Sequence, residues 1–248
     1  MVSDQLCEYY GLVTHLDEQV GRVLEAVRNS PQADNTIVIY TADHGLAMGS
    51  HGLLGKQNVY EQSMRCPLIV SGPKIPKGEL TEALTYIHDL YSTVGTFAGI
   101  DIPAGAESEN LGPILNGTAE TVHDSIFLPY QDSQRSVTDG RWKLHVYPKV
   151  NHRLLFDLKS DPHEMNNLAE ATEHQETLSR MTGLMDSWRG KLQDPNPLSA
   201  EKPESKELSF DNSKRVLDVW QPKWIRDKYY DGRTKTDHGR KQSAAQKK

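Results

Sequence analysis

The sequence predicts an α/β fold that is followed by a small antiparallel subdomain with a helix. Residues 4–28 repeat apolar side chains at spacings of three and four, which indicates an amphipathic helix. Two short runs, 35–40 and 67–71, are apolar on both faces, as buried parallel strands are. Further along, Asp139-Gly140 is a hairpin signal between strand-like segments. A helix, a turn and a buried strand make half of an α/β unit, and the hairpins come after it.

The remaining elements follow from turn residues and periodicity. Asn29-Ser30-Pro31 ends the first helix. We expect further helices over residues 85–99 and 167–192, and strands over residues 125–128, 135–147 and 154–158. From residue 194 on, proline and charge dominate, so little regular structure is expected before residue 216. The chain therefore divides into an α/β part (1–122), an antiparallel β subdomain with a C-terminal helix (123–192) and an irregular tail (193–248).

Composition excludes several classes of protein. The 248 residues, 36% of them hydrophobic, suit one large domain or one domain with an appendage. The net charge of −6 gives no reason to expect nucleic-acid binding, although the stretch 221–248 is basic and is read as a solvated terminus. Two cysteines exclude a disulfide framework. No apolar run is long enough to predict a membrane span, and no signal peptide opens the chain.

Asp43 and His44 are the first candidates for chemistry. They stand just past the C-terminal end of the strand predicted over residues 35–40, and in open α/β sheets ligands bind at that edge. An adjacent carboxylate and imidazole can both reach one divalent cation. An Asp-His-Gly triplet alone also occurs in ordinary turns. The spacing of the residues that follow therefore distinguishes a metal site from a turn.

That spacing forms an ordered set of motifs. In chain order they read Thr41-Ala42-Asp43-His44-Gly45, Gly49-Ser50-His51-Gly52, Gly55-Lys56, Tyr60-Glu61, Arg65-Cys66-Pro67-Leu68-Ile69-Val70, Asp139-Gly140-Arg141-Trp142-Lys143-Leu144 and Leu155-Phe156-Asp157-Leu158, then Asp161-Pro162, Glu164 and Asn167-Leu168. The set resembles the sulfatase family of the alkaline-phosphatase superfamily, over roughly residues 5–190. The resemblance implies part of an alkaline-phosphatase-like mixed sheet sandwiched by helices, with residues 1–122 as the C-terminal part of the catalytic domain.

The resemblance also implies roles for single residues. Asp43 and His44 would be metal ligands, and Lys56 would bind a sulfate oxygen as a catalytic contact. His51 lies close in sequence and would donate to the sulfate or shape its loop. A lysine ammonium and a divalent cation both stabilise the charge that develops during S–O cleavage. The metal would be Ca²⁺, as is usual in the family, with Mn²⁺ as the alternative because His44 stands where many members have asparagine.

Three further histidines are candidates for other roles. His145 and His152 lie where the C-terminal subdomain would overhang a substrate pocket, so we assign them to substrate binding. His88, followed by Asp89 on a predicted helix, is read as structural, with an approach to the site as the alternative.

The resemblance places the nucleophile elsewhere. Family members use a cysteine matured to formylglycine within Cys-x-Pro-Ser-Arg or Cys-x-Ala-Ser-Arg, and neither Cys7 nor Cys66 has that context. We therefore expect the formylglycine segment, and further metal ligands, in an N-terminal half that precedes residue 1. Two ligands alone cannot hold a calcium ion that wants about six to eight oxygens.

The predicted function is thus that of a sulfatase C-terminal half. It would hydrolyse a sulfate ester of a carbohydrate or a small organic molecule, and would be inactive without its N-terminal half, which becomes a partner if the protein is split. A phosphodiesterase or phosphonate monoester hydrolase of the same superfamily is one alternative. A non-catalytic truncated or split subunit is the other. No membrane or nucleic-acid partner is expected, and the sequence assigns no compartment.

Overall fold

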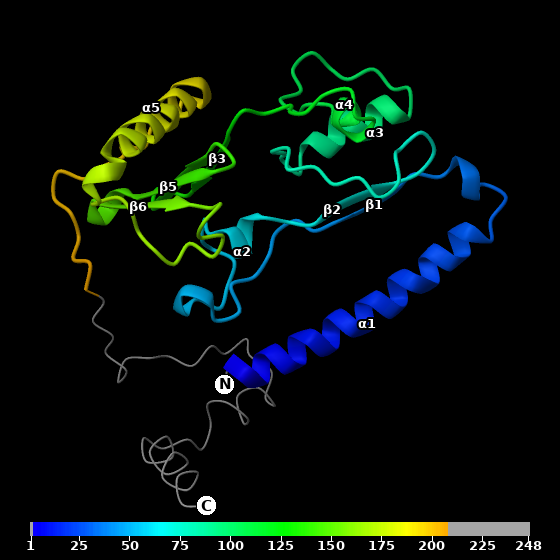
Figure 1. Ribbon diagram of the computed structural model, residues 1–248, viewed down its shortest axis with the longest axis horizontal. Helices are drawn as coiled ribbons and strands as arrows, with labels where there is room; N and C mark the ends of the chain where they lie inside the picture. Colours follow the sequence, from blue (N-terminus) through cyan, green and yellow to red (C-terminus); the bar gives the residue numbers. More distant parts are fainter. Residues whose placement is uncertain (1, 208–248) are drawn as a thin grey trace, which may run out of the picture.

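The computed structural model describes residues 2–207, and Figure 1 shows their arrangement. A long helix, α1 (Val2–Arg28), runs along one side of the molecule and leads through a short 3-10 turn to a two-stranded sheet. A second, four-stranded sheet with a helix on it makes up the other end of the molecule (Figure 1). The sequence prediction of a mixed α/β chain with a small antiparallel C-terminal part is confirmed.

Helix α1 is the amphipathic helix that the sequence predicts, and it ends at Arg28 as expected. Asp4 in its first turn and Arg28 in its last turn both suit the helix dipole. Its large apolar side chains are nevertheless exposed, and they include Tyr10, Leu12, Val13, Leu16 and Val23. The apolar stripe of α1 is therefore not buried against the rest of the described chain.

Strands β1 (Val38–Thr41) and β2 (Leu68–Ser71) form the first sheet, and here one expectation is wrong. The two strands pair antiparallel, with Val38 opposite Ser71, and they are not parallel strands buried on both faces. A parallel crossover usually needs a helix that packs along the sheet. The connection here contains only the 3-10 turn η2 (Ser50–Gly52) and the single-turn helix α2 (Glu61–Met64), so the chain folds straight back.

Two short helices follow β2. They are α3 (Asp89–Phe97) and α4 (Gly112–Leu115). The helix expected over residues 85–99 begins only at Asp89, because the Asp89 carboxylate accepts a hydrogen bond from the backbone N–H of Tyr86 at 2.7 Å and fixes a turn there.

The second sheet is an antiparallel meander. Its strands are β3 (Ile126–Tyr130), β4 (Gln134–Thr138), β5 (Trp142–Tyr147) and β6 (His152–Asp157), hydrogen-bonded in that order. The hairpin predicted at Asp139-Gly140 joins β4 to β5, and Gly140 adopts the left-handed conformation with φ 92° that a tight turn favours. The segment predicted over residues 135–147 is thus two strands, and the strands predicted over residues 125–128 and 154–158 are confirmed within a few residues at each end.

Helix α5 (Gln175–Leu192) covers one face of this sheet and closes the main core (Figure 1). The buried core residues are Phe127, Val137, Leu144, Val146, Leu155, Ala169, Met181 and Met185. The helix starts later than the expected residue 167, because the Asn167 side chain accepts hydrogen bonds from the N–H groups of Leu155 and Ala169 at 3.0 Å each. These bonds keep that stretch extended beside β6.

Contacts cross the division that the sequence analysis places after residue 122. The Tyr86 hydroxyl donates to the backbone oxygen of Phe127 at 3.1 Å, and the Gln134 amide donates to the oxygen of Gln57 at 3.2 Å. The division into 1–122 and 123–192 stays a proposal, with the two parts packed together. Residues 194–207 contain no helix or strand, and the basic stretch 221–248 lies outside the described residues. Within residues 2–207, no helix has the length and apolar character to cross a bilayer.

Candidate active site

The candidate site begins where β1 ends. Asp43 and His44 follow the strand, and Gly45 fixes them against α2. The Gly45 N–H donates to the Ser63 oxygen at 2.8 Å, and a Cβ on Gly45 would lie 2.0 Å from the backbone oxygen of Gln62. Only glycine allows the two backbones to approach this closely. The loop that presents Asp43 and His44 is therefore held in place by its contact with α2.

His44, Asp43 and Lys56 converge at this point. His44 Nε2 lies 3.2 Å from Asp43 Oδ2, and the Lys56 ammonium is in contact with the same nitrogen. His44 Nδ1 lies 2.9 Å from the Gly45 carbonyl oxygen, which can only accept a hydrogen bond, so Nδ1 carries the proton and Nε2 presents its lone pair. The Asp43 side chain is 80% exposed, so this group opens to solvent.

These three side chains fit part of a cation site. A carboxylate oxygen and an imidazole lone pair face each other at 3.2 Å, and a positive charge relieves the repulsion between two acceptors so close. In the described structure that charge is the Lys56 ammonium. No group of three or more His, Cys, Asp or Glu residues suited to a metal occurs within residues 2–207. Asp43 and His44 can thus supply two ligands, and a tightly bound ion needs others.

His51, five residues before Lys56 in the chain, is fixed in an unusual conformation. Its φ is 52°, in the left-handed region that a non-glycine residue rarely adopts. Its ring stacks on Tyr60 with centroids 3.9 Å apart, and Nε2 lies 3.1 Å from the backbone oxygen of His163. The backbone oxygen can only accept, so Nε2 of His51 donates. His51 is therefore bound to the C-terminal subdomain, at the edge of the loop that carries Lys56.

A buried ionic cluster lies beneath this loop. The Lys143 ammonium is 2.7 Å from Glu61 Oε1 and 3.0 Å from Glu164 Oε1, and the latter oxygen also lies 3.1 Å from His145 Nε2. Glu164 Oε2 accepts a hydrogen bond from the Glu61 N–H at 2.6 Å. Lys143, His145 and Glu164 are all buried, and buried charges persist only when they are paired in this way.

Burial also sets the ionisation of the cluster. Burial lowers the pKa of His145 to about 4, and its contact with Glu164 offsets this only in part, so His145 is neutral at physiological pH. Burial alone would raise the pKa of Glu164, but its contacts with His145, Lys143 and the Glu61 N–H hold that pKa below the usual value. Burial likewise raises the pKa of Tyr147, whose hydroxyl interacts with that of Tyr60. The cluster therefore pairs a carboxylate with an ammonium around a neutral imidazole.

His145 and His152, the two histidines predicted to bind substrate, lie in different surroundings. His145 is fully buried and contacts Tyr60, Phe156 and Glu164, so it packs beneath the Lys56 loop and does not face solvent. His152 stands at the start of β6, where it borders a cavity of about 400 Å³ with Arg153, Glu170 and Lys206 among its lining residues. Its Nδ1 is 3.4 Å from the Lys206 ammonium. Contacts thus unite Asp43, His44 and Lys56, while His152 lies in a separate pocket.

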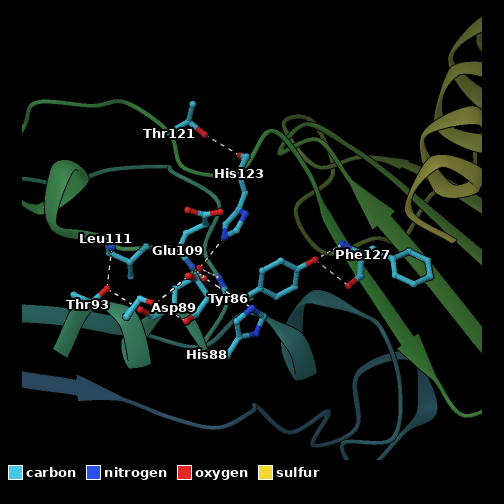
Figure 2. Close-up of polar contacts among 11 residues, drawn as sticks. Tyr86, His88, Asp89, Thr93, Glu109, Leu111, Thr121, His123 and Phe127 are labelled. Carbon is cyan, nitrogen blue, oxygen red and sulfur yellow. Dashed lines mark hydrogen bonds and ion pairs between the residues drawn. The ribbon is translucent and has the colours of Figure 1, made fainter. Parts of the chain in front are cut away.

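Asp89 has the structural role that the sequence analysis favoured. Its buried carboxylate accepts hydrogen bonds from the N–H groups of Tyr86 and Glu109 at 2.7 and 2.9 Å, and lies 2.9 Å from His123 Nε2 (Figure 2). The Tyr86 ring extends from this group to Phe127 on β3, where its hydroxyl bonds to both backbone groups (Figure 2). Asp89 therefore connects α3, the following loop and the second sheet.

Sequence reasoning did not single out Glu61, Lys143 or Glu164. All three stand inside the quoted motifs, at Tyr60-Glu61, Trp142-Lys143-Leu144 and His163-Glu164. The signal in the sequence is Lys143, a lysine at a position of a predicted strand that faces the protein core. Such a residue needs an acidic partner, and two glutamates in neighbouring motifs could provide it.

The chain is similar to known proteins. The family model described as N-sulphoglucosamine sulphohydrolase, C-terminal, matches residues 49–191. The N-acetylglucosamine-6-O-sulfatase of Bacteroides thetaiotaomicron is 28% identical over 224 residues, which cover 85% of this chain and 39% of that protein.

Solved structures show the same fold. The structure of a protein in complex with its substrate D-glucosamine-2-N,6-O-disulfate matches with a TM-score of 0.68 at 27% identity, over 76% of this chain and 41% of that one. The phosphonate monoester hydrolase of Silicibacter pomeroyi matches with a TM-score of 0.67 at 27% identity, over 74% of this chain and 40% of that one. The chain thus spans about 40% of the length of the proteins that it resembles. Because the family model covers more than half of its residues, the chain belongs to the sulfatases, an alkaline-phosphatase-like family, and corresponds to their C-terminal region.

Proposed function

We propose that this chain forms the C-terminal part of a sulfuric ester hydrolase and supplies the sulfate contact and part of the metal site. One observation carries the proposal: His44, Asp43 and Lys56, from two separate motifs, meet at the C-terminal end of β1. An exposed ammonium beside an exposed carboxylate and an imidazole lone pair suits a site where an anionic substrate and a cation bind together.

Lys56 is proposed as the residue that binds a sulfate oxygen. Its side chain is exposed on the loop and already lies beside His44, so its ammonium can reach an anion there. An ammonium placed next to the ester stabilises the negative charge that develops on oxygen as the S–O bond breaks. His51, fixed by its stacking on Tyr60, is proposed as a second donor or as the residue that shapes the loop.

Asp43 and His44 are proposed as metal ligands. A divalent cation bound there would polarise the sulfate oxygens as a Lewis acid. The carboxylate oxygen suits Ca²⁺, and the imidazole nitrogen makes Mn²⁺ the alternative. With its proton on Nδ1 at the Gly45 oxygen, His44 keeps a lone pair on Nε2, which Lys56 contacts in this structure and which an ion would take over.

The other ligands and the nucleophile are proposed to come from an N-terminal sulfatase segment that carries formylglycine. The exposed apolar stripe of α1 and the exposed side chains of Tyr40 and Ile69 on the first sheet support this proposal. Exposed apolar areas of this kind mark surfaces that another polypeptide covers. The chain alone is then expected to be inactive, whether that segment is part of the same polypeptide or a separate subunit.

The proposed substrate is a sulfated carbohydrate, with a small organic sulfate as the alternative. Support comes from the names of the proteins that it resembles, an N-acetylglucosamine-6-O-sulfatase and a structure with bound D-glucosamine-2-N,6-O-disulfate. His152, beside Lys206 in its cavity, is proposed as a contact for a distal part of such a sugar. The substrate role predicted for His145 is replaced by a supporting one, since its ring is buried.

Co-expression tests the proposal. The 248-residue chain is produced alone, and also with an N-terminal sulfatase segment that carries Cys-x-Pro-Ser-Arg, in a host that makes formylglycine. Turnover of 4-nitrophenyl sulfate is expected only for the pair, and Lys56→Ala in the pair should remove most of it. Turnover by the chain alone, with Ca²⁺ or Mn²⁺ added, would contradict the need for the N-terminal segment.

The same assay separates the alternatives. The similarity to a phosphonate monoester hydrolase keeps that activity open as a second candidate. A pair that turns over a phosphonate monoester faster than the sulfate ester would support it. A pair that forms a stable complex but turns over neither ester would instead support a non-catalytic subunit.

A further inference from the structure

Glu164 combines burial, charge and an unfavourable backbone conformation. Its side chain is buried, and its φ of 55° lies in the left-handed region. A non-glycine residue keeps such a conformation only where the surrounding contacts impose it, and such residues concentrate at functional sites.

Its carboxylate holds the helix that directly follows the Lys56 loop, which we define as residues 49–60. Oε2 accepts a hydrogen bond from the Glu61 N–H at 2.6 Å, and Oε1 lies 3.0 Å from the Lys143 ammonium. Lys143 closes a ring by its 2.7 Å contact with Glu61 Oε1. Hydrogen bonds and ion pairs between charged groups are strong, and a buried network of them fixes one geometry.

The residue before Glu164 holds the other end of the same loop. The His163 oxygen accepts a hydrogen bond from His51 Nε2, and His51 has a left-handed φ of 52° like that of Glu164. The His51 ring stacks on Tyr60, and Tyr60 meets the His145 ring edge-on at 4.9 Å. Two adjacent residues of the C-terminal subdomain thus fix the start and the end of the Lys56 loop.

We propose that Glu164 is a positioning residue for the candidate sulfate site, which acts by holding the Lys56 loop against the second sheet. The inference rests on the proposed role of Lys56 but concerns a different residue and a different subdomain. The Glu164 carboxylate is buried among Glu61, Lys143 and His145 and does not open to solvent. It acts through Glu61 and, by way of the neighbouring His163, through His51.

The first test is NMR on the full 248-residue chain, with the His51 ring signals assigned by comparison with His51→Ala. Glu164→Gln keeps the shape of the side chain and removes its charge. The His51 ring signals should shift, and the amides of residues 50–60 should exchange about tenfold faster or more, the factor expected for loss of one hydrogen bond to a charged group. Glu173→Gln makes the same change at an exposed position and should alter neither. A folded Glu164→Gln protein with wild-type His51 signals and exchange rates would overturn the proposal.

The wild-type protein provides a measurement that does not depend on how the variant folds. If Glu164 holds the loop, the Glu61 amide should exchange as slowly as the amides of β5. Exchange of the Glu61 amide at the rate of the exposed loop amides would overturn the proposal even if Glu164→Gln fails to fold.

Titration with inorganic sulfate separates this inference from the proposed function. The positioning role predicts weaker sulfate binding in both Lys56→Ala and Glu164→Gln, with His51 disturbed only in the latter. Loss of binding in Lys56→Ala, but wild-type affinity in a folded Glu164→Gln protein, would overturn the positioning role alone. Wild-type affinity in Lys56→Ala would overturn the proposed sulfate contact, and the His51 signals would still decide the role of Glu164.

Discussion

The Lys56 ammonium lies against Nε2 of His44, the nitrogen that also faces Asp43. A lysine from the loop thus occupies the position where a cation bound by Asp43 and His44 would need to be. Metal and ammonium compete for one imidazole lone pair, so a bound metal should release Lys56 towards an anion.

Asp43→Ala should weaken binding of Mn²⁺ to the 248-residue chain by about tenfold or more, because one of only two ligands is lost. Isothermal titration measures this, and Asp34→Ala, which removes an exposed carboxylate elsewhere, is the control. His44→Asn should shift the preference from Mn²⁺ towards Ca²⁺, since an amide oxygen replaces an imidazole nitrogen. Equal Mn²⁺ affinity in the wild type and Asp43→Ala would remove Asp43 from the metal site.

Lys56→Ala should lower kcat of the reconstituted pair by roughly two to three orders of magnitude, as expected for loss of one charge donor in the transition state. Lys56→Arg should recover little, because a planar guanidinium does not replace a compact ammonium. Steady-state kinetics with 4-nitrophenyl sulfate give both values, and Lys77→Ala at an exposed position is the control. Full activity in Lys56→Ala would make Lys56 an ordinary solvated loop residue.

Gly45→Ala should destabilise the fold by about 1–3 kcal/mol, since its Cβ would overlap the Gln62 carbonyl oxygen and force the backbones apart. Urea unfolding measures the change. Gly11→Ala is the matched control, because a Cβ on Gly11 in α1 meets nothing within 4 Å and should be neutral or mildly stabilising. Equal stability of the two variants would show that the close approach at Gly45 is not rigid.

The free energy of unfolding should fall as the pH is lowered from 6.5 to about 4. An unfolded histidine takes up its proton near pH 6.5, whereas burial lowers the pKa of His145 to about 4, so the unfolded chain binds more protons in this window. The loss should be at most about 3 kcal/mol. Urea unfolding across this range measures it. His145→Gln should flatten the slope, and His15→Gln, at an exposed position on α1, should not. An unchanged slope in His145→Gln would contradict the lowered pKa of the buried His145 ring.

The sequence alone predicted the order of elements well, because helix periodicity and hairpin signals are local. The Asp139-Gly140 turn is an example, since its residues determine the turn without help from the rest of the chain. Strand direction is not local. The apolar runs of β1 and β2 predicted parallel strands, but the connection between them lacks a crossover helix and the strands pair antiparallel.

The site was predictable only where its residues follow a strand end or a motif. Asp43, His44 and Lys56 were found in this way, and the structure brings them together. His145 was expected to face a substrate, but an alternating strand pattern does not show which face another segment covers. In the structure that face is covered by Glu164 and Tyr60, and burial makes His145 a neutral packing partner.

The Asp89 carboxylate accepts a hydrogen bond from the Glu109 N–H and so connects α3 to the loop that follows it. The Thr93 hydroxyl makes a second connection, because it accepts a hydrogen bond from the Leu111 N–H at 2.8 Å. These bonds join residues 89–93 to residues 109–111, on the two sides of the backbone from 99 to 107. A protease cut in that stretch should leave one particle in native electrophoresis and two fragments only after denaturation.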